Sequence, residues 1–392
     1  MNATTGITYK MINTRNELEN LIGAIENEKA VGVDLEADSM YHFQEKVCLI
    51  QMAATNINVV IDPLAIQDLS PLKPIFKRSD ICKIFHGADY DVRSLHRDFR
   101  ITIHNLFDTE LASRFLGFPE TGLEAVLKKK FAVTLDKKFQ RKDWSRRPLP
   151  PDMIAYAAED ARYLLPLAQG LKAELDERNR LGWVNEECEY LSRVRPITVN
   201  DQPLYLNFKG AGKLDSRSLA VLENLLGFRR EVARRKDKPL FRIFGNRSLM
   251  ELAGKKPLNL KQLEKTRALS SRQISMYGRQ MLAAIQGAVN LPAEELPVYP
   301  RKKLPRISLA VAGRVKALRT WRDKQAQKLA IDPALICNKA LMSTIAVQRP
   351  LNLSELAAIK EMKNWQKKEF GRDIVRVLKQ ECQKHTTNIE NC

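Results

Sequence analysis

The sequence lacks several features that would assign it to a class at once. No apolar run approaches the 18 residues of a membrane span, and the start, MNATTGITYK, has no apolar signal-peptide core. The six cysteines are scattered without a C-x-x-C pair, which argues against a zinc site and favours free thiols in a reducing compartment. We therefore expect a cytoplasmic protein of two or three domains, with no membrane partner.

Acidic residues are scarce in one half of the chain only. Residues 1–200 hold 27 Lys and Arg against 29 Asp and Glu, a balance of −2, whereas residues 201–392 hold 38 against 17, a balance of +21. A neutral half joined to a basic half is typical of a catalytic part linked to a part that binds a polyanion, and nucleic acid is the commonest polyanion. An anionic membrane is the alternative, but the cations are spread over helices with full apolar stripes.

The first half alternates strand and helix patterns. Strands are predicted at residues 7–12, 30–38, 47–54, 57–62 and 81–86. Thr14 and Glu17 form a capping box, and helices are predicted at 71–76, 88–99, 108–116, 123–131 and from Asp152 onward. This order predicts an α/β domain over residues 1–200, with a mixed sheet covered by helices.

After residue 196 strand patterns vanish and the sequence repeats itself at an offset of 93 residues. Pro257-Leu-Asn-Leu260 falls on Pro350-Leu-Asn-Leu353, and Tyr277-Gly-Arg279 falls on Phe370-Gly-Arg372. Two all-helical domains are therefore expected at 210–290 and 307–388. The segment 291–306 has four prolines and is predicted to be a linker.

Four acids and a tyrosine of the first half form a possible site. Asp34 and Glu36 lie two apart on a strand and share one face, whereas Asp91 lies in the first turn of a helix. Tyr156 and Asp160 lie four apart on one inner helix face. Solvent exposure, the helix dipole and a hydrogen-bonded core network would explain each acid taken singly. Together they suit two hard divalent cations, Mg²⁺ or Mn²⁺, that bind a phosphodiester.

These motifs resemble the three exonuclease motifs of the DEDD superfamily, in its tyrosine branch. The segment TLDKKFQRKDWSRRPLPPDMIAYAAEDARYLLPL resembles bacterial ribonuclease D more closely, and the helical repeats resemble HRDC domains. The resemblance covers roughly residues 7–385. It implies an RNase H-like fold for the first domain, followed by two HRDC-like helical bundles.

The resemblance also implies a metal-dependent 3′–5′ exoribonuclease that releases nucleoside 5′-monophosphates and trims tRNA precursors and other structured RNAs. Asp34, Glu36, Asp91 and Asp160 would bind two divalent ions, with Asp34 as the bridging ligand. Glu36 would also accept a hydrogen bond from the terminal 3′-OH, and Tyr156 would orient the attacking water. We expect a monomer.

The second and first motifs each need a comment. Asp91 is preferred to Asp89 because only Asp91 precedes Leu95 with the D-x-x-x-L spacing. In the first motif Leu35 and Ala37 stand where ribonuclease D commonly has a threonine and an aromatic residue. An aromatic contact to the terminal nucleotide is therefore not expected here.

Five further residues are candidates for RNA contacts, each with a structural alternative. They are His86, Trp144, Arg147, Arg229 and Arg322. Two other functions stay open at this point. One is a DNA 3′–5′ exonuclease of the Werner type, and the other is a catalytically silent scaffold that only binds RNA.

Overall fold

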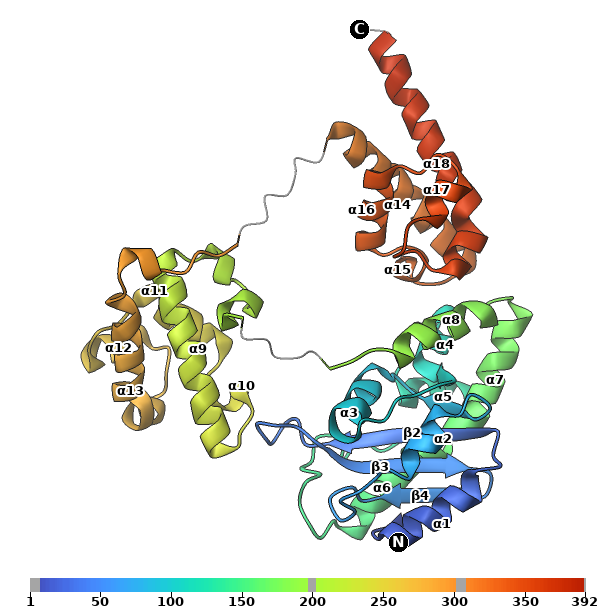
Figure 1. Cartoon of the computed structure of the whole chain (residues 1–392), viewed down its shortest axis with the longest axis horizontal. Coiled ribbons are helices and arrows are strands. Elements are labelled where there is room, and N and C mark those ends of the chain that lie inside the picture. The colour runs from blue at the N-terminus through green and yellow to red at the C-terminus, as the bar shows by residue number, and fades with distance from the viewer. Residues whose placement is uncertain (1–7, 197–201, 301–307, 391–392) are drawn as a thin grey trace. The chain divides into compact units, whose positions relative to one another are not determined.

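The computed structural model describes residues 8–196, 202–300 and 308–390 (Figure 1). They divide into two compact units. One unit holds the described residues up to Glu36, then Val47–Pro196 and the second helical repeat, and the other holds Ala37–Lys46 and the first helical repeat. Within the described ranges no helix is long and apolar enough to cross a membrane.

The first domain is built on a six-stranded mixed sheet with the order β1-β4-β3-β2-β5-β6. The pairs β1–β4, β2–β5 and β5–β6 are parallel, and β3–β4 is antiparallel. The strands are β1 (Lys10–Ile12), β2 (Ala30–Ala37), β3 (Val47–Ala54), β4 (Ile57–Ile61), β5 (Cys82–Phe85) and β6 (Leu106–Asp108). Five of them were predicted, and the short β6 was missed.

The described part of the first domain has eight helices. They are α1 (Arg15–Ile25), α2 (Leu72–Lys77), α3 (Asp89–Phe99), α4 (Thr109–Phe115), α5 (Leu123–Phe131), α6 (Pro151–Arg162), α7 (Leu164–Glu177) and α8 (Leu181–Ser192). Six of them lie where helices were predicted, α7 was expected as a continuation of α6, and α8 was missed. The predicted capping box is present at the start of α1, where the Thr14 side chain accepts from the Glu17 N–H and the Glu17 carboxylate accepts from the Thr14 N–H.

The start of α6 differs from the prediction. The helix begins at Pro151, so Asp152 lies in its first turn and does not cap it. Proline suits the first helical position because its missing N–H would have no intrahelical partner there. The expected single long helix is also interrupted at Tyr163, and α7 continues as a separate helix.

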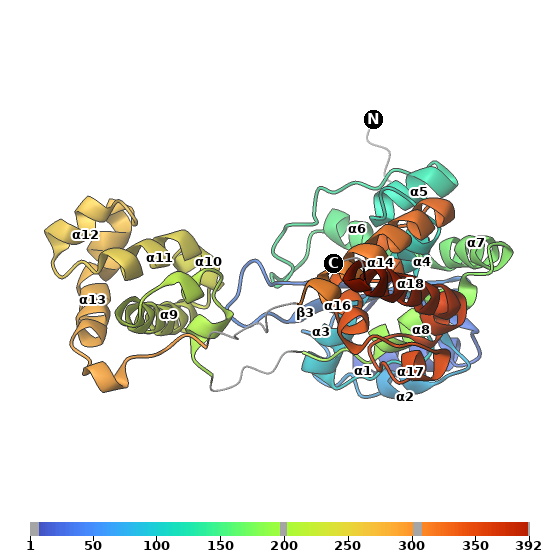
Figure 2. The ribbon, with the colours of Figure 1, turned by 90° about the horizontal axis from the view of Figure 1, so that it is seen from above.

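The two helical repeats reproduce the sequence offset in space. The first consists of α9 (Ser216–Lys236), α10 (Leu240–Ile243), α11 (Asn246–Lys255), α12 (Leu260–Thr266) and α13 (Ser271–Val289). The second consists of α14 (Leu309–Leu329), α15 (Pro333–Ile336), α16 (Lys339–Gln348), α17 (Leu353–Ala357) and α18 (Asn364–Glu390). Every helix of the second repeat begins 93 residues after its counterpart in the first. Figure 2 looks down α9, with α11 and α13 packed beside it.

Part of the predicted linker packs on the first repeat. Leu291, Leu296 and Tyr299 contact its apolar core, and the Tyr299 ring lies 3.0 Å from the position of a Cβ on Gly212. The segment 291–300 is therefore a packed extension of the first repeat. The remainder of the predicted linker, 301–306, lies outside the described residues.

The second repeat packs on the first domain through aromatic side chains of α8 and α18. The Trp183 and Trp365 rings stack with centroids 4.8 Å apart, and Phe115 meets Trp365 edge-on at 5.5 Å. The Glu186 carboxylate accepts hydrogen bonds from the backbone N–H groups of Asn364 and Trp365, at 2.7 and 2.8 Å. A carboxylate at this helix start is favoured by the exposed N–H groups and the helix dipole.

Candidate active site

Strand β2 presents the first two acids on one face. Side chains two apart on a strand point the same way, so Gly32, Asp34 and Glu36 share a face and Leu35 points into the core on the other. The backbone of Gly32 lies close to the helix layer: a Cβ there would lie 3.0 Å from the Ala161 carbonyl oxygen, tighter than an ordinary contact.

The contact between Gly32 and Ala161 brings the third acid, Asp160, close to β2. Asp160 precedes Ala161 on α6, and Gly32 stands two residues before Asp34 on β2. The contact between Gly32 and Ala161 therefore involves backbone within two residues of both carboxylates. Both are half-buried, and the Asp34 charge affects the ionisation of Asp160, as described below.

The fourth acid, Asp91, lies in the first turn of α3 and is 7% exposed. The turn before α3 is fixed by Asp108 at the end of β6. Its carboxylate accepts from the N–H groups of Gly87 at 3.0 Å and Ala88 at 2.8 Å. Gly87 has a φ of +78°, a conformation that favours glycine. Asp108 thus positions Asp91, a role that the sequence analysis missed because it shows Asp108 only as the start of α4.

Burial and neighbouring negative charges raise the pKa values of the four carboxyl groups. Burial raises the pKa of Asp34 to about 6, and burial and the Asp34 charge raise the pKa of Asp160 to about 8. Burial and neighbouring acids also hold the pKa values of Glu36 and Asp91 well above their usual range. The Asp34 charge raises the pKa of all three other acids, which makes Asp34 the electrostatic centre of the site.

No positive side chain of the described residues lowers these pKa values. Buried carboxylates without a cation are costly, and an all-oxygen donor set suits hard divalent cations. The donor chemistry therefore fits Mg²⁺ or Mn²⁺. As the side chains stand, no three acid, histidine or cysteine side chains in the described ranges close around a common ion.

Tyr156 lies one turn before Asp160 on α6, and its ring is held by two aromatic neighbours. Its centroid lies 5.7 Å from that of Phe139 and 6.1 Å from that of Trp144. Burial, followed by the charges of Asp160, Glu36 and Asp34, raises the pKa of the Tyr156 hydroxyl above its ordinary value. The phenol therefore stays protonated at neutral pH and can donate a hydrogen bond.

Two residues of the basic loop before α6 are structural, which does not support their expected RNA contacts. Trp144 is 1% exposed and packs under Tyr156. Arg147 donates to both oxygens of Asp62, at 2.6 and 2.7 Å, and to the carbonyls of Trp144 and Cys48. The guanidinium also donates to the Arg146 carbonyl, so all five of its N–H groups are engaged within the protein and none is left for a phosphate.

His86 also has an internal partner. Its Nδ1 lies 2.9 Å from the Thr109 hydroxyl, which itself donates to the Phe85 carbonyl. Burial lowers the pKa of His86, and its Nε2 is shielded from solvent. The expected phosphate contact therefore lacks support.

Arg229 and Arg322 are equivalent in the two repeats and share one structural role. Arg229 donates to the Phe244 carbonyl at 3.2 Å, and Arg322 donates to the Cys337 carbonyl at 3.3 Å. Phe244 and Cys337 are themselves 93 residues apart. Each arginine thus stabilises the segment after the short second helix of its repeat, which leaves the expected RNA contacts unsupported.

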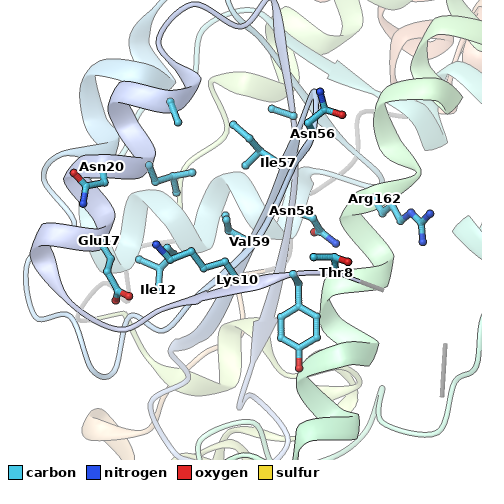
Figure 3. Close-up of a pocket in the computed structure, with 14 residues that line it drawn as sticks. Thr8, Lys10, Ile12, Glu17, Asn20, Asn56, Ile57, Asn58, Val59 and Arg162 are labelled. Atoms are coloured by element: carbon cyan, nitrogen blue, oxygen red, sulfur yellow. The ribbon is translucent and has the colours of Figure 1, made fainter. Parts of the chain in front are cut away.

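A hollow of about 660 Å³ lies elsewhere, at the edge formed by β1 and β4 (Figure 3). Lys10, Glu17, Asn58 and Arg162 contribute polar groups to its lining. None of the four acids lines it, so it is separate from the candidate active site.

Comparisons with known proteins agree with this architecture. The 3′-5′ exonuclease family matches residues 9–176, and the HRDC domain family matches residues 218–285 and 311–378. Ribonuclease D of Escherichia coli (strain K12) is 30% identical over 292 residues, covering 74% of this chain and 78% of the relative. Ribonuclease D of Desulfotalea psychrophila is 28% identical over 370 residues, covering 94% and 97%. The crystal structure of Escherichia coli RNase D superposes with a TM-score of 0.74 at 26% identity, covering 95% of this chain and 99% of that one.

The fold and the family matches define a 3′–5′ exonuclease domain of RNase H-like architecture, followed by two HRDC domains. The two HRDC matches start 93 residues apart, at the offset of the internal repeat. With the similarity to the Escherichia coli enzyme over more than two thirds of both chains, these findings place the chain in the ribonuclease D family.

Proposed function

We propose that this protein hydrolyses RNA from the 3′ end and releases nucleoside 5′-monophosphates. The observation that carries the proposal is the set of four carboxylates on β2, α3 and α6, whose pKa values are raised by burial and, for three of them, by the Asp34 charge, with no cation to offset them. Buried carboxylates without a compensating charge destabilise the folded state, so a site built from four of them requires a bound cation. Membership of the ribonuclease D family supplies the class of reaction.

Asp34, Glu36, Asp91 and Asp160 would hold two divalent ions, Mg²⁺ or Mn²⁺. Asp34 is the candidate to share both ions, because its charge acts on each of the other three acids. When bound, the ions would acidify a water molecule and neutralise charge on the phosphodiester.

In the hydrolysis, the water oxygen forms a bond to the last phosphorus and the bond from that phosphorus to the penultimate 3′-oxygen breaks. A proton passes to the leaving oxygen, so the products are a 5′-monophosphate and an RNA one residue shorter. The Tyr156 phenol, protonated and fixed between Phe139 and Trp144, would donate a hydrogen bond that orients the water. Glu36 would accept a hydrogen bond from the terminal 3′-OH.

We propose tRNA precursors and other structured RNAs with 3′ extensions as substrates. The support is the similarity to the Escherichia coli enzyme, which is described as an exoribonuclease involved in structured RNA processing. We also propose that the protein acts as a monomer in the cytoplasm.

The test is to incubate the protein with a 3′-extended tRNA and with single-stranded DNA of matched length, with and without Mg²⁺ or Mn²⁺. We expect stepwise release of 5′-monophosphates from the RNA and none in EDTA. Preferential hydrolysis of DNA would favour the Werner-type activity, and equal activity in EDTA would refute the metal site. Asp34→Asn should abolish hydrolysis with an unchanged circular dichroism spectrum.

A further inference from the structure

One corner of the first HRDC domain combines exposed cations with an exposed aromatic ring. We define the corner as residues 234–242, which run from the last turn of α9 through most of α10. It contains five Lys or Arg and a single acid. Phe241 is 55% exposed, and in the described structure no ion pair or hydrogen bond engages the side chains of Arg234, Arg235 and Lys238.

The single acid of the corner, Asp237, contacts another segment of the same unit. The Asp237 carboxylate lies 2.6 Å from His42 Nδ1 and accepts from the Phe43 N–H at 3.0 Å. Both partners belong to the segment Ala37–Lys46, which forms one compact unit with the first repeat. Asp237 also interacts electrostatically with Lys238, and one acid offsets only one of the corner's five cations, so the corner keeps a surplus of positive charge.

The equivalent corner of the second repeat, residues 327–335, has a different use. It packs on the exonuclease domain: the Leu329 carbonyl accepts from Arg180 at 2.8 Å, and Ile331 is 7% exposed. The Ala330 carbonyl oxygen lies so near Gly117 that a Cβ there would be 1.9 Å away. This corner carries one cation and one acid, and Ala334 stands where the first repeat has Phe241.

The comparison separates what the fold needs from what it does not. Both corners have the same helix boundaries, offset by 93 residues, so neither the five cations nor the exposed aromatic ring is needed to form this local structure. The first corner is stabilised by the apolar residues that follow it in the chain. Ile243 and Phe244 are buried, and the Phe244 ring stacks on Phe228. The exposed Phe241 ring therefore adds an apolar π face beside the cations that the local fold itself does not need.

We propose that Phe241, Arg234 and Lys238 form a subsite for single-stranded RNA, with a base stacked on Phe241 and phosphates bound by the two cations. Single-stranded nucleic acid combines π faces with regularly spaced negative charge, which is the complement of this surface. A membrane would need a larger apolar face than one ring. The subsite rests on the proposed function in that it takes RNA to be the substrate.

The test measures binding of a fluorescent single-stranded RNA to the chain carrying Asp160→Asn, which prevents cleavage during the titration. We expect Phe241→Ala and Phe241→Leu to weaken binding by about 5- to 100-fold, the usual range for loss of one base–aromatic stack. Phe241→Tyr keeps the ring and should bind like the parent. Folding is preserved because the side chain is exposed and the second repeat carries alanine there.

An abasic RNA of the same length isolates stacking from charge. Phe241→Ala should not weaken its binding, whereas Arg234→Gln and Lys238→Gln should each lower the slope of log affinity against log salt by about 0.7. Arg272→Gln, an exposed cation at the start of α13, is the matched control and should have a smaller effect.

Two results would overturn the subsite: unchanged affinity in Phe241→Ala, or an equal loss for abasic RNA. An effect of Arg272→Gln as large as that of Lys238→Gln would show that charge binding is not confined to the corner. Because binding is measured without cleavage, these results are independent of the hydrolysis assay. A chain that binds through Phe241 but does not cleave RNA would refute only the proposed function.

Discussion

Asp160→Asn should make the metal-free protein more stable, although it removes a residue of the candidate site. The ordinary pKa of this carboxyl is 3.8, and in the folded chain burial and the Asp34 charge raise it to about 8. Between these values the folded state keeps a proton that the unfolded state has lost, so stability falls as the pH rises. At pH 7 the resulting loss in the free energy of unfolding is at most about 4 kcal/mol, because each pH unit above 3.8 contributes about 1.36 kcal/mol.

The assay is urea unfolding of both chains in EDTA from pH 4 to pH 8. We expect the variant to gain about 2 to 4 kcal/mol at pH 7 and almost nothing near pH 4, where Asp160 is protonated in both states. Asp152→Asn, an exposed acid in the first turn of the same helix, is the control and should change stability by less than about 1 kcal/mol. If the variant is no more stable than the parent at pH 7, or is stabilised equally at pH 4, the electrostatic reasoning is refuted.

Divalent metal provides the second arm of the same experiment. Bound metal stabilises the folded state in proportion to the logarithm of its concentration over its dissociation constant. Millimolar Mg²⁺ or Mn²⁺ should therefore stabilise the parent more than Asp160→Asn and reduce the difference between them. An equal response of the two chains would show that Asp160 does not bind the metal.

Three further predictions test other parts of the structure. Tyr156→Phe should lower kcat about 10- to 100-fold with RNA affinity unchanged, because it removes only the positioning hydroxyl; a large affinity loss would mean that the hydroxyl binds RNA. Gly32→Val should cost about 1 to 3 kcal/mol and most of the activity, because its side chain meets the Ala161 carbonyl; unchanged activity would contradict this placement of Asp160. Trp365→Ala should cost about 3 to 5 kcal/mol in urea unfolding, because Trp365 is 4% exposed and stacked on Trp183; a change below 1 kcal/mol would show that the docked contact is weak.

The parts of the fold that sequence alone predicted are those with a local cause. The capping box of Thr14 and Glu17 fixed the start of α1 because both partners lie within one turn. The run Val47–Ala54 predicted β3 with both bounds correct, because a strand buried on both faces is apolar at nearly every position, here at all but Gln51. The short strand β6 has only three residues and carries no pattern of its own.

The candidate RNA contacts depended on long-range partners that no local pattern shows. Arg147 occurs in a basic loop, yet its guanidinium binds Asp62, which lies 85 residues earlier in the chain. Trp144 occurs in the same loop and lies under Tyr156. The sequence around a loop arginine is the same whether its side chain faces solvent or forms an ion pair with a distant residue. The two possibilities could therefore not be separated before the fold was known.

The internal repeat adds a comparison that a single domain could not provide. Positions that keep their role in both copies, such as Arg229 and Arg322, identify what the helical fold itself requires. Positions that differ identify what each copy does beyond folding. At the corner after the first long helix, the second copy packs Leu329 and Ile331 on the exonuclease domain, and the first copy exposes Phe241 among cations. The basic surplus of the second half is therefore a less specific guide to RNA binding than this corner, where the two copies differ in chemistry while keeping the same helix boundaries.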